Sequence, residues 1–451
     1  MAIITRFAPS PTGNLHIGGV RTALFNYLFS RKNKGQYLLR IDDTDKVRSK
    51  KEYEENILNG FKDLGLIWDN KEIIRQSERT EIYRKYIEKL LGEDKAYVSK
   101  ETEIAEGERA EVIRLRNPNK PVMFTDMIRG EVTFDTTELG DFVIAKSADE
   151  PVYHFASVID DFEMGITHVI RAEEHLSNTS RQILIQEAVG APRPIYAHIP
   201  MILAPDRSKL SKRHGATALT DYIMKGYLPE AIINYLAFLG WNPGGEREIY
   251  SLDELVEIFD IEKVQKAGAI FNIEKLDWYN HQYIMKMEEE AFISASRQFI
   301  PDWLYKNTTV LKRLVPIIKE KVSVLEEIAS LFDTSGELCF VKQIHDYPSR
   351  LLLWKNDPVA SNALLHLERT RSLMREIPET DFDATSVKNA IWKYADEHGK
   401  GNVLWPLRVA LTGQERSPDP FVSAHVLGKY EALKRIDLAY DKLSKLNDAK
   451  S

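Results

Sequence analysis

Apolar and polar positions at the start of the chain follow two different periods. Residues 3–7 form a short β-prone run, and residues 8–14 form a turn-rich stretch with two prolines. From residue 20 to 32 apolar side chains recur every three or four positions, as on one face of a helix. Residues 36–41 predict a second strand. Together these segments predict a parallel β-α-β unit, which binds ligands at the carboxyl ends of its strands.

The pattern predicts that this sheet resumes after an insertion. Residues 167–172 form another strand candidate, and residues 180–189 form a helix that Gly190 and Pro192 would end. Short β-prone pieces separated by turns lie in between, at residues 112–115, 131–134 and 141–144. They indicate an inserted α+β segment.

The pattern becomes helical after about residue 214. Pro229 is expected to open an apolar helix that Gly240 closes, and Ser251 with Glu254 forms a capping-box pattern. Helical segments continue beyond residue 288, with aromatic anchors that we expect in the core. These anchors are Trp303, Trp354, Trp392 and Trp405.

Composition narrows the class of protein. A chain of 451 residues, 43% hydrophobic and 29% charged, is expected to be globular and multidomain. It has no apolar run of about 18 residues and its start lacks a secretory pattern, so we expect a cytoplasmic protein with no membrane partner. The single cysteine, Cys339, excludes a disulfide within the chain and a multi-cysteine zinc site. The net charge of -7 argues against non-specific nucleic-acid binding by the whole chain, but not against a local basic groove.

The turn between the first strand and its helix carries residues that suit a phosphate. Gly18 and Gly19 lie where helix N–H groups favour anions and where glycine lets a ligand approach closely. His16 can donate a hydrogen bond to a phosphoryl oxygen on which charge develops. Taken alone, such a histidine is more often an ordinary loop residue.

A basic loop much later in the chain suits a pyrophosphate leaving group. Lys209, Ser211, Lys212 and Arg213 follow a turn at residues 205–207. Cations on a mobile loop can close over phosphates as negative charge builds there. Alone, this segment is typical of a solvated loop, but the two motifs together favour a nucleotide site.

The two motifs resemble those of class I aminoacyl-tRNA synthetases. Residues 7–18, FAPSPTGNLHIG, and residues 209–213, KLSKR, are similar to the form found in bacterial glutamyl-tRNA synthetases. Further stretches look like blocks of that family, at residues 40–45, 153–156 with 160–161, 167–179 and 226–231. The resemblance is strong over about the first 280 residues and weak in the helical part that follows.

The resemblance implies a ligase that activates glutamate with ATP and transfers it to the 3′ end of a tRNA. From chemistry alone, Arg171 suits the substrate's side-chain carboxylate, because a guanidinium can bind it in bidentate fashion. The resemblance implies that Asp42 contacts the substrate ammonium group. The family more often has glutamate at this position, so the side chain that makes this contact is one methylene shorter here. The implied glutamate site consists of Arg6, Ala8, Ser10, Asp42, Tyr153 and Arg171. The implied ATP site consists of His16, Gly19, Glu174, His175 and Lys212. The implied catalytic set is His16, Gly18, Gly19, Lys209, Ser211, Lys212 and Arg213.

The expected fold is an α/β Rossmann-type catalytic domain with an α+β insertion, followed by an all-α C-terminal anticodon-binding region. The catalytic halves are residues 1–76 and 156–213, separated by an acceptor-end-binding insertion at 77–155. A stem-contact region at 214–287 and a helical anticodon-binding region at 288–451 complete the chain.

Metals and partners follow from the same resemblance. Many family members bind zinc through cysteines and a histidine in the insertion, but this chain has AYVS at residues 96–99, so we expect no zinc. ATP and Mg²⁺ are the implied cofactors, and tRNA(Glu) and L-glutamate the implied partners of a monomeric enzyme. The sequence leaves open whether tRNA(Gln) is also charged, because the choice of tRNA depends on the helical C-terminal part, where the resemblance is weak.

Three alternatives remain from the sequence. A glutaminyl enzyme usually has a first motif resembling Pro-Glu-Pro-Asn-Gly, whereas this chain has PSPTG at residues 9–13. A shorter relative that glutamylates a modified tRNA base lacks the helical half found here. A non-catalytic RNA-binding paralogue would be expected to have lost His16 or Lys212, and both are present.

Overall fold

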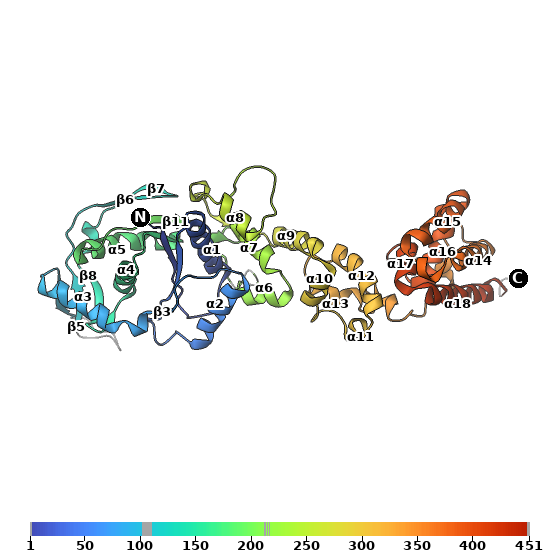
Figure 1. The fold of residues 1–451 in the computed structure, drawn as a ribbon, viewed down its shortest axis with the longest axis horizontal. Coiled ribbons are helices and arrows are strands. Elements are labelled where there is room, and N and C mark those ends of the chain that lie inside the picture. Colours follow the sequence, from blue (N-terminus) through green and yellow to red (C-terminus); the bar gives the residue numbers. More distant parts are fainter. Residues whose placement is uncertain (1, 102–110, 212, 214, 216, 449–451) are drawn as a thin grey trace. The chain divides into compact units, whose positions relative to one another are not determined.

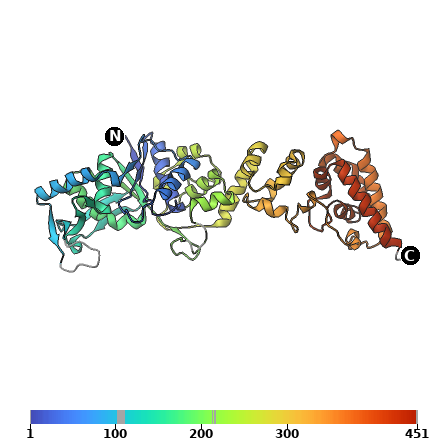
Figure 2. The same ribbon diagram turned by 90° about the horizontal axis from the view of Figure 1, so that it is seen from below.

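The chain divides into two compact units, Met1–Tyr283 and Ile284–Ser451. The first unit is coloured blue to yellow-green in Figure 1 and the second yellow to red. Figure 2 shows strands and helices mixed in the first unit and helices in the second. The computed structural model describes residues 2–101, 111–211, 213, 215 and 217–448. Within those ranges, no helix has the length and apolar character needed to cross a membrane.

The first β-α-β unit forms as its sequence pattern predicts. β1 (Ile4–Phe7) pairs in parallel with β2 (Gln36–Ile41), and α1 (Ile17–Lys32) connects them. α1 begins at Ile17 rather than at residue 20, because His16 caps it by accepting a hydrogen bond from the Gly18 N–H at 3.0 Å. The weak helix propensity of glycine hides this first turn from the apolar pattern. The unit continues with α2 (Lys51–Asp63) and β3 (Ile74–Arg75), which is parallel to β2.

A second set of strands lies beside β1. β10 (His168–Ala172) and β11 (Ile195–Ile199) are parallel, and the Thr167 N–H donates to the Ile4 carbonyl at 3.0 Å where β1 and β10 begin. Parallel strands therefore return after the insertion as predicted, with β10 beside β1, but the two sets of strands form separate sheets. The sheet order is β10-β11-β6-β7, completed by β6 (Val122–Asp126) and β7 (Gly130–Phe134). β6 meets β11 through the pair Asp126 and Tyr196.

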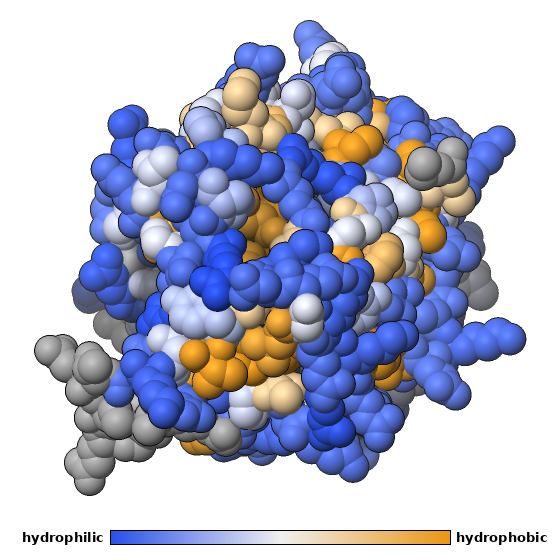
Figure 3. Space-filling view, turned by 90° about the vertical axis from the view of Figure 1, so that its left-hand side faces the viewer, coloured by the Kyte–Doolittle hydropathy of each residue, from blue (hydrophilic) through white to orange (hydrophobic). Residues whose placement is uncertain are grey.

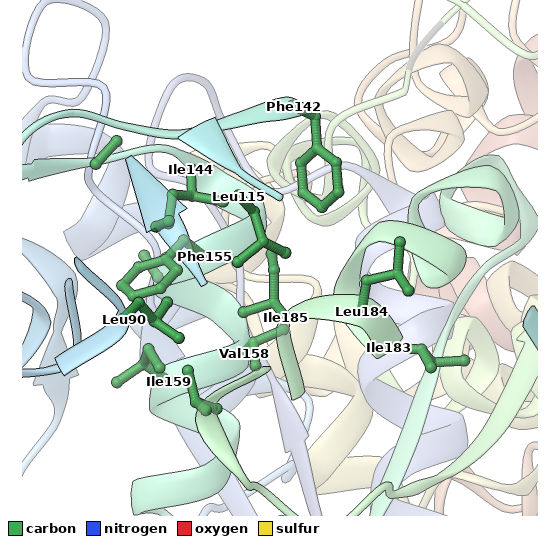
Figure 4. Close-up of a cluster of buried hydrophobic side chains, with 14 of the residues drawn as sticks. Leu90, Leu115, Phe142, Ile144, Phe155, Val158, Ile159, Ile183, Leu184 and Ile185 are labelled. Atoms are coloured by element: carbon green, nitrogen blue, oxygen red, sulfur yellow. The ribbon is translucent and has the colours of Figure 1, made fainter. Parts of the chain in front are cut away.

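A four-stranded antiparallel sheet lies in the inserted segment. Its order is β4-β5-β8-β9, made by β4 (Ala96–Lys100), β5 (Glu111–Leu115), β8 (Phe142–Ser147) and β9 (Glu150–Pro151). Helices cover the strands, namely α3 (Thr80–Gly92), α4 (Tyr153–Glu163) and α5 (Leu176–Val189). Figure 4 shows their shared core, in which Leu90, Leu115 and Phe155 are buried. The face of this unit in Figure 3 is mostly hydrophilic, as burial of the apolar side chains predicts.

One strand precedes the basic loop, and a second follows the first three helices after it. β12 (Ile202–Leu203) and β13 (Ala269–Ile270) pair in parallel. The predicted capping box is confirmed, because the Glu254 N–H donates to Ser251 Oγ at 3.2 Å and the Ser251 N–H donates to Glu254 Oε2 at 2.8 Å. The helices here are α6 (Leu219–Lys225), α7 (Pro229–Phe238), α8 (Leu252–Ile258) and α9 (Ile273–Lys286).

The described part of the second unit is helical and contains no strand. Its larger helices pack around one core that includes Leu367, Ile391, Leu407 and Ile436. The expectation that Trp392 is a core residue is wrong, because 38% of its surface is exposed. The helices are α10 (Glu289–Ala295), α11 (Asp302–Tyr305), α12 (Thr308–Lys321), α13 (Glu327–Leu331), α14 (Ala360–Glu376), α15 (Ala384–His398), α16 (Lys400–Thr412), α17 (Pro420–Leu427) and α18 (Lys429–Asp448). The expected fold class, mixed α/β followed by all α, is confirmed.

Candidate active site

A cavity of about 390 Å³ lies at the carboxyl ends of the parallel strands. Residues just beyond β1, β2, β10 and β11 line it, where the β-α-β pattern predicts a ligand site. Most of the predicted site residues meet here. They are Arg6, Ala8, His16, Gly18, Gly19, Asp42, Tyr153, Arg171, Glu174, His175 and Lys209. Ser10, Ser211 and Arg213 do not line the cavity. Lys212 lies outside the described residues.

The N-terminus of α1 forms one wall of the cavity. His16 Nδ1 accepts a hydrogen bond from the Gly18 N–H, so the ring proton lies on Nε2 and can be donated. A Cβ atom added at Gly18 would lie 3.2 Å from His16 Nδ1, and one at Gly19 would lie 3.4 Å from Phe7 Cζ. Both glycines line the cavity, and a side chain at Gly18 would crowd the His16 ring. The Ile17 and Gly18 N–H groups already have acceptors within the protein.

The segment that follows the basic loop is hydrogen-bonded to this wall. The Ile17 N–H donates to the Thr217 carbonyl at 3.0 Å, and the Leu219 N–H donates to the Leu15 carbonyl at 2.8 Å. The two motifs are therefore neighbours in space, although they lie far apart in the sequence. Lys209 reaches the cavity and donates to Glu174 Oε2 at 2.5 Å.

Arg6 and Asp42 line another part of the cavity and belong to a buried network of arginines and aspartates. Arg6 donates through Nε to Asp161 at 3.0 Å, and Arg40 bridges Asp161 and Asp42, at 2.7 Å each. Burial raises the pKa of Asp42 to about 6, although Arg40 opposes this. Burial also acts to raise the pKa of Asp161, but Arg6 and Arg40 together hold it below its usual value. The sequence pattern predicted no role for Arg40 or Asp161, because the partners in a buried ion pair are set by tertiary contacts.

Arg171 projects into the cavity from β10. Its Nε donates to His198 Nε2 at 3.1 Å and its Nη2 donates to Thr179 Oγ1 at 2.7 Å. Burial lowers the pKa of Arg171 below its usual value. The nearby His175 has its pKa lowered to about 4, first by burial and then by Arg171, so it is neutral at pH 7. The arrangement presents the guanidinium groups of Arg171 and Arg6 to a substrate anion, while the neighbouring His175 carries no charge.

Two cavity residues of α1 escaped sequence reasoning. Arg21 is 1% exposed and lines the cavity with Thr22. Among the described residues, none accepts a hydrogen bond from Arg21 Nε or Nη2, and burial lowers the pKa of this arginine to about 10. Arg21 stands among apolar neighbours in the sequence of α1, which could have suggested a buried charge. The apolar pattern alone did not distinguish Arg21 from a solvent-exposed residue.

The described residues hold no group of three or more His, Cys, Asp or Glu side chains placed to bind a metal ion. The cavity instead combines an anion-binding helix start, a nearby lysine and buried arginines. Such a site suits a ligand that carries both phosphates and a carboxylate.

Sequence comparison identifies known families over nearly the whole chain. Residues 2–106 and 100–278 match the tRNA synthetases class I (E and Q), catalytic domain. Residues 286–440 match the anticodon binding domain. The glutamate–tRNA ligase of Carboxydothermus hydrogenoformans is 41% identical, over 96% of this chain and 98% of that protein. The glutamate–tRNA ligase of Desulforamulus reducens is 39% identical, over 97% of this chain and 100% of that protein.

Solved structures agree with these relatives. The glutamate–tRNA ligase from Elizabethkingia meningosepticum, crystallised in complex with its amino acid, superposes with a TM-score of 0.84 at 31% identity. The match covers 98% of this chain and 100% of that one. The glutamate–tRNA synthetase from Elizabethkingia anophelis gives a TM-score of 0.82 at 32% identity, with the same coverage.

Proposed function

Because the chain belongs to the glutamate–tRNA ligases of the class I aminoacyl-tRNA synthetases, we propose that its cavity activates L-glutamate with ATP. The α-carboxylate of glutamate attacks the α-phosphate of ATP and pyrophosphate leaves. The 3′-terminal ribose hydroxyl of tRNA(Glu) then attacks the mixed anhydride, and AMP leaves. Catalysis rests on positioning and charge stabilisation, so no side-chain nucleophile is needed.

Glutamate occupies the arginine-rich wall in this proposal. Arg171, with Arg6 and Tyr153 beside it, binds the side-chain carboxylate. Asp42 accepts from the substrate ammonium; Arg40 already contacts it, but a carboxylate oxygen accepts more than one hydrogen bond. Ala8 borders the same space. Ser10 is exposed and outside the cavity lining, so its contact requires the bound substrate to reach beyond the cavity.

ATP occupies the wall built by α1 and the basic loop. His16 donates from Nε2 to a phosphoryl oxygen, while Gly18 and Gly19 let the phosphates approach the helix N-terminus. Lys209 and Lys212, with Ser211 and Arg213, stabilise the departing pyrophosphate. Glu174 and His175 lie beside the nucleotide. Mg²⁺ enters bound to ATP and supplies further positive charge at the phosphates.

We assign the remaining segments to tRNA. The insertion at 77–155 receives the acceptor end, residues 214–287 contact the stem, and residues 288–451 hold the anticodon. The match of residues 286–440 to an anticodon binding domain supports the last assignment. The enzyme acts as a cytoplasmic monomer, and the proposal includes charging of tRNA(Gln) as a second activity to be tested.

One observation carries the proposal: a single cavity contains both the nucleotide motif, through His16 and Lys209, and the carboxylate-binding Arg171. The test is charging of purified tRNA(Glu) and tRNA(Gln) with labelled glutamate or glutamine. We expect glutamate on tRNA(Glu). Glutamine accepted in preference to glutamate would refute the assignment, and glutamate on tRNA(Gln) would establish the second activity.

A further inference from the structure

A fully buried histidine, His198, lies directly behind Arg171. His198 Nε2 is 3.1 Å from Arg171 Nε, and His198 Nδ1 is 2.6 Å from Asp126 Oδ2. Both His198 and Asp126 have side chains with no exposed surface. The three side chains therefore form a hydrogen-bonded series that crosses β6, β11 and β10, in which Arg171 lines the cavity and His198 and Asp126 do not.

The direction of each hydrogen bond in this chain is fixed by chemistry. An arginine side chain can only donate, so His198 Nε2 must be the unprotonated ring nitrogen. The ring proton then lies on Nδ1 and is donated to Asp126. Burial lowers the pKa of His198 below its usual value, which keeps the ring in this neutral form.

Asp126 is itself fixed as an acceptor. Its Oδ1 accepts from the backbone N–H groups of Ile128 and Arg129, at 2.9 Å each. Its Oδ2 accepts from the His198 N–H at 3.0 Å as well as from Nδ1. Burial acts to raise the pKa of Asp126, but the hydrogen bond from His198 and those from the backbone hold it below its usual value. The carboxylate is therefore ionised and cannot rotate without losing these bonds.

The consequence for Arg171 is a fixed guanidinium plane. Nε is held by His198 and Nη2 by Thr179, at 2.7 Å. Among the described residues, no acceptor contacts Nη1, and Arg171 lines the cavity. A guanidinium anchored on two of its nitrogens leaves the third for a ligand.

We propose that Asp126 and His198 are positioning residues for substrate recognition, which hold Arg171 so that Nη1 faces the substrate's side-chain carboxylate. This inference rests on the proposed role of Arg171 in binding glutamate. Neither residue touches the substrate. They act by fixing which atom of Arg171 is available and in which direction it points.

Two substitutions of His198 separate this role from simple core packing. In His198→Gln the amide oxygen can take the place of Nε2 and accept from Arg171 Nε, while the contact to Asp126 is lost. In His198→Asn the amide nitrogen can take the place of Nδ1 and donate to Asp126, while the acceptor for Arg171 is lost. Both variants are neutral and polar. They therefore differ mainly in which hydrogen bond is kept, the one to Arg171 or the one to Asp126.

The assay is steady-state charging of tRNA(Glu) at saturating tRNA, with glutamate and ATP varied in turn. We expect His198→Asn to raise the KM for glutamate roughly tenfold or more with little change in the KM for ATP, the scale of a misplaced contact. His198→Gln should stay within about threefold of the parent enzyme. Equal glutamate KM values in the two variants, or an equal rise in the KM for ATP, would overturn the inference.

Asp126→Asn provides a second variant if His198→Asn does not fold. The amide introduced at position 126 can donate to His198 Nδ1, which moves the proton of the His198 ring to Nε2. Nε2 is then a donor that faces the Arg171 Nε–H, so Arg171 loses its acceptor. The glutamate KM should rise as in His198→Asn, and adding His198→Gln should restore it, because glutamine does not depend on Asp126. No rise in Asp126→Asn, or no restoration in the double variant, counts against the inference. Circular dichroism and thermal melting establish that each variant is folded.

Arg171→Ala measured in parallel distinguishes two kinds of failure. If Arg171→Ala leaves the glutamate KM unchanged, the proposed function of Arg171 is wrong. If Arg171→Ala raises the glutamate KM but His198→Asn and Asp126→Asn do not, only the positioning role is wrong.

Discussion

Replacing Arg171 by alanine tests the recognition of the substrate's side chain most sharply. In the structure Arg171 lines the cavity, and its Nη1 has no acceptor among the described residues, so a carboxylate there gains at least one hydrogen bond to a charged donor. Such a bond contributes about 1.5–3 kcal/mol. At 1.4 kcal/mol per tenfold change, Arg171→Ala should raise the KM for glutamate roughly 10- to 150-fold.

The same substitution should leave the KM for ATP nearly unchanged. The nucleotide contacts proposed for His16 and Lys209 come from α1 and the basic loop rather than from β10. The assay is charging of tRNA(Glu) with each substrate varied separately, and Arg171→Lys serves as the control that keeps the charge but loses the planar group. A similar rise in both KM values would show that Arg171 supports the fold instead of recognising the substrate.

Stability has to be followed in the same variant. Arg171→Ala removes the hydrogen bonds that its guanidinium donates to His198 Nε2 and Thr179 Oγ1 in a buried setting, which costs about 1–3 kcal/mol of unfolding free energy, although the Thr179 hydroxyl still lies 3.1 Å from His198 Nε2. Thermal melting should therefore show a destabilised but folded protein. Kinetics from an unfolded preparation would not bear on recognition.

Three further predictions follow from the site. Lys212→Ala should lower the rate of charging by roughly a hundredfold or more without loss of fold, the scale of one transition-state charge contact, and near-normal charging by the folded variant would contradict this. Protonation of Asp42, whose pKa burial raises to about 6, removes the negative charge offered to the ammonium. The KM for glutamate should therefore rise as pH falls through about 6. Asp42→Asn should have a high KM for glutamate at all these pH values. If Asp42→Asn kept the same rise at low pH as the parent enzyme, the role of Asp42 would be excluded. Removing residues after 287 should leave ATP binding largely intact and sharply weaken tRNA affinity at matched salt, with circular dichroism as the check on folding; unchanged affinity would exclude the assignment of this part to the anticodon.

Local patterns predicted the elements that carry the nucleotide motif. The β1-α1-β2 unit, the strand at β10, α5 and the capping box of α8 all follow from apolar periodicity and from the residues at their ends. Strands β3, β4, β6, β9, β11, β12 and β13 were missed. β9 is only two residues long, too short for a period to show, and β6 is held mainly by its antiparallel pairing with β7, from Val122 opposite Phe134 to Asp126 opposite Gly130.

The site was predictable only where a residue acts through its own chemistry. His16, Arg171 and Lys209 have side chains whose charge or donors suggest a ligand, and the cavity contains all three. His198 and Arg21 were not found, because their roles depend on which neighbours the fold brings near. Trp392 shows the opposite error, since a large aromatic residue on a helix was expected in the core and is exposed.

The most direct test of the account is exchange of labelled pyrophosphate into ATP by the purified full-length protein. Exchange reports formation of the aminoacyl-adenylate, the step that the cavity is proposed to perform. We predict exchange that requires glutamate, is not supported by glutamine, and depends on tRNA(Glu), as the resemblance to glutamyl-tRNA synthetases implies. Exchange supported by glutamine instead of glutamate, or no exchange with glutamate, ATP and tRNA(Glu) all present, would contradict it.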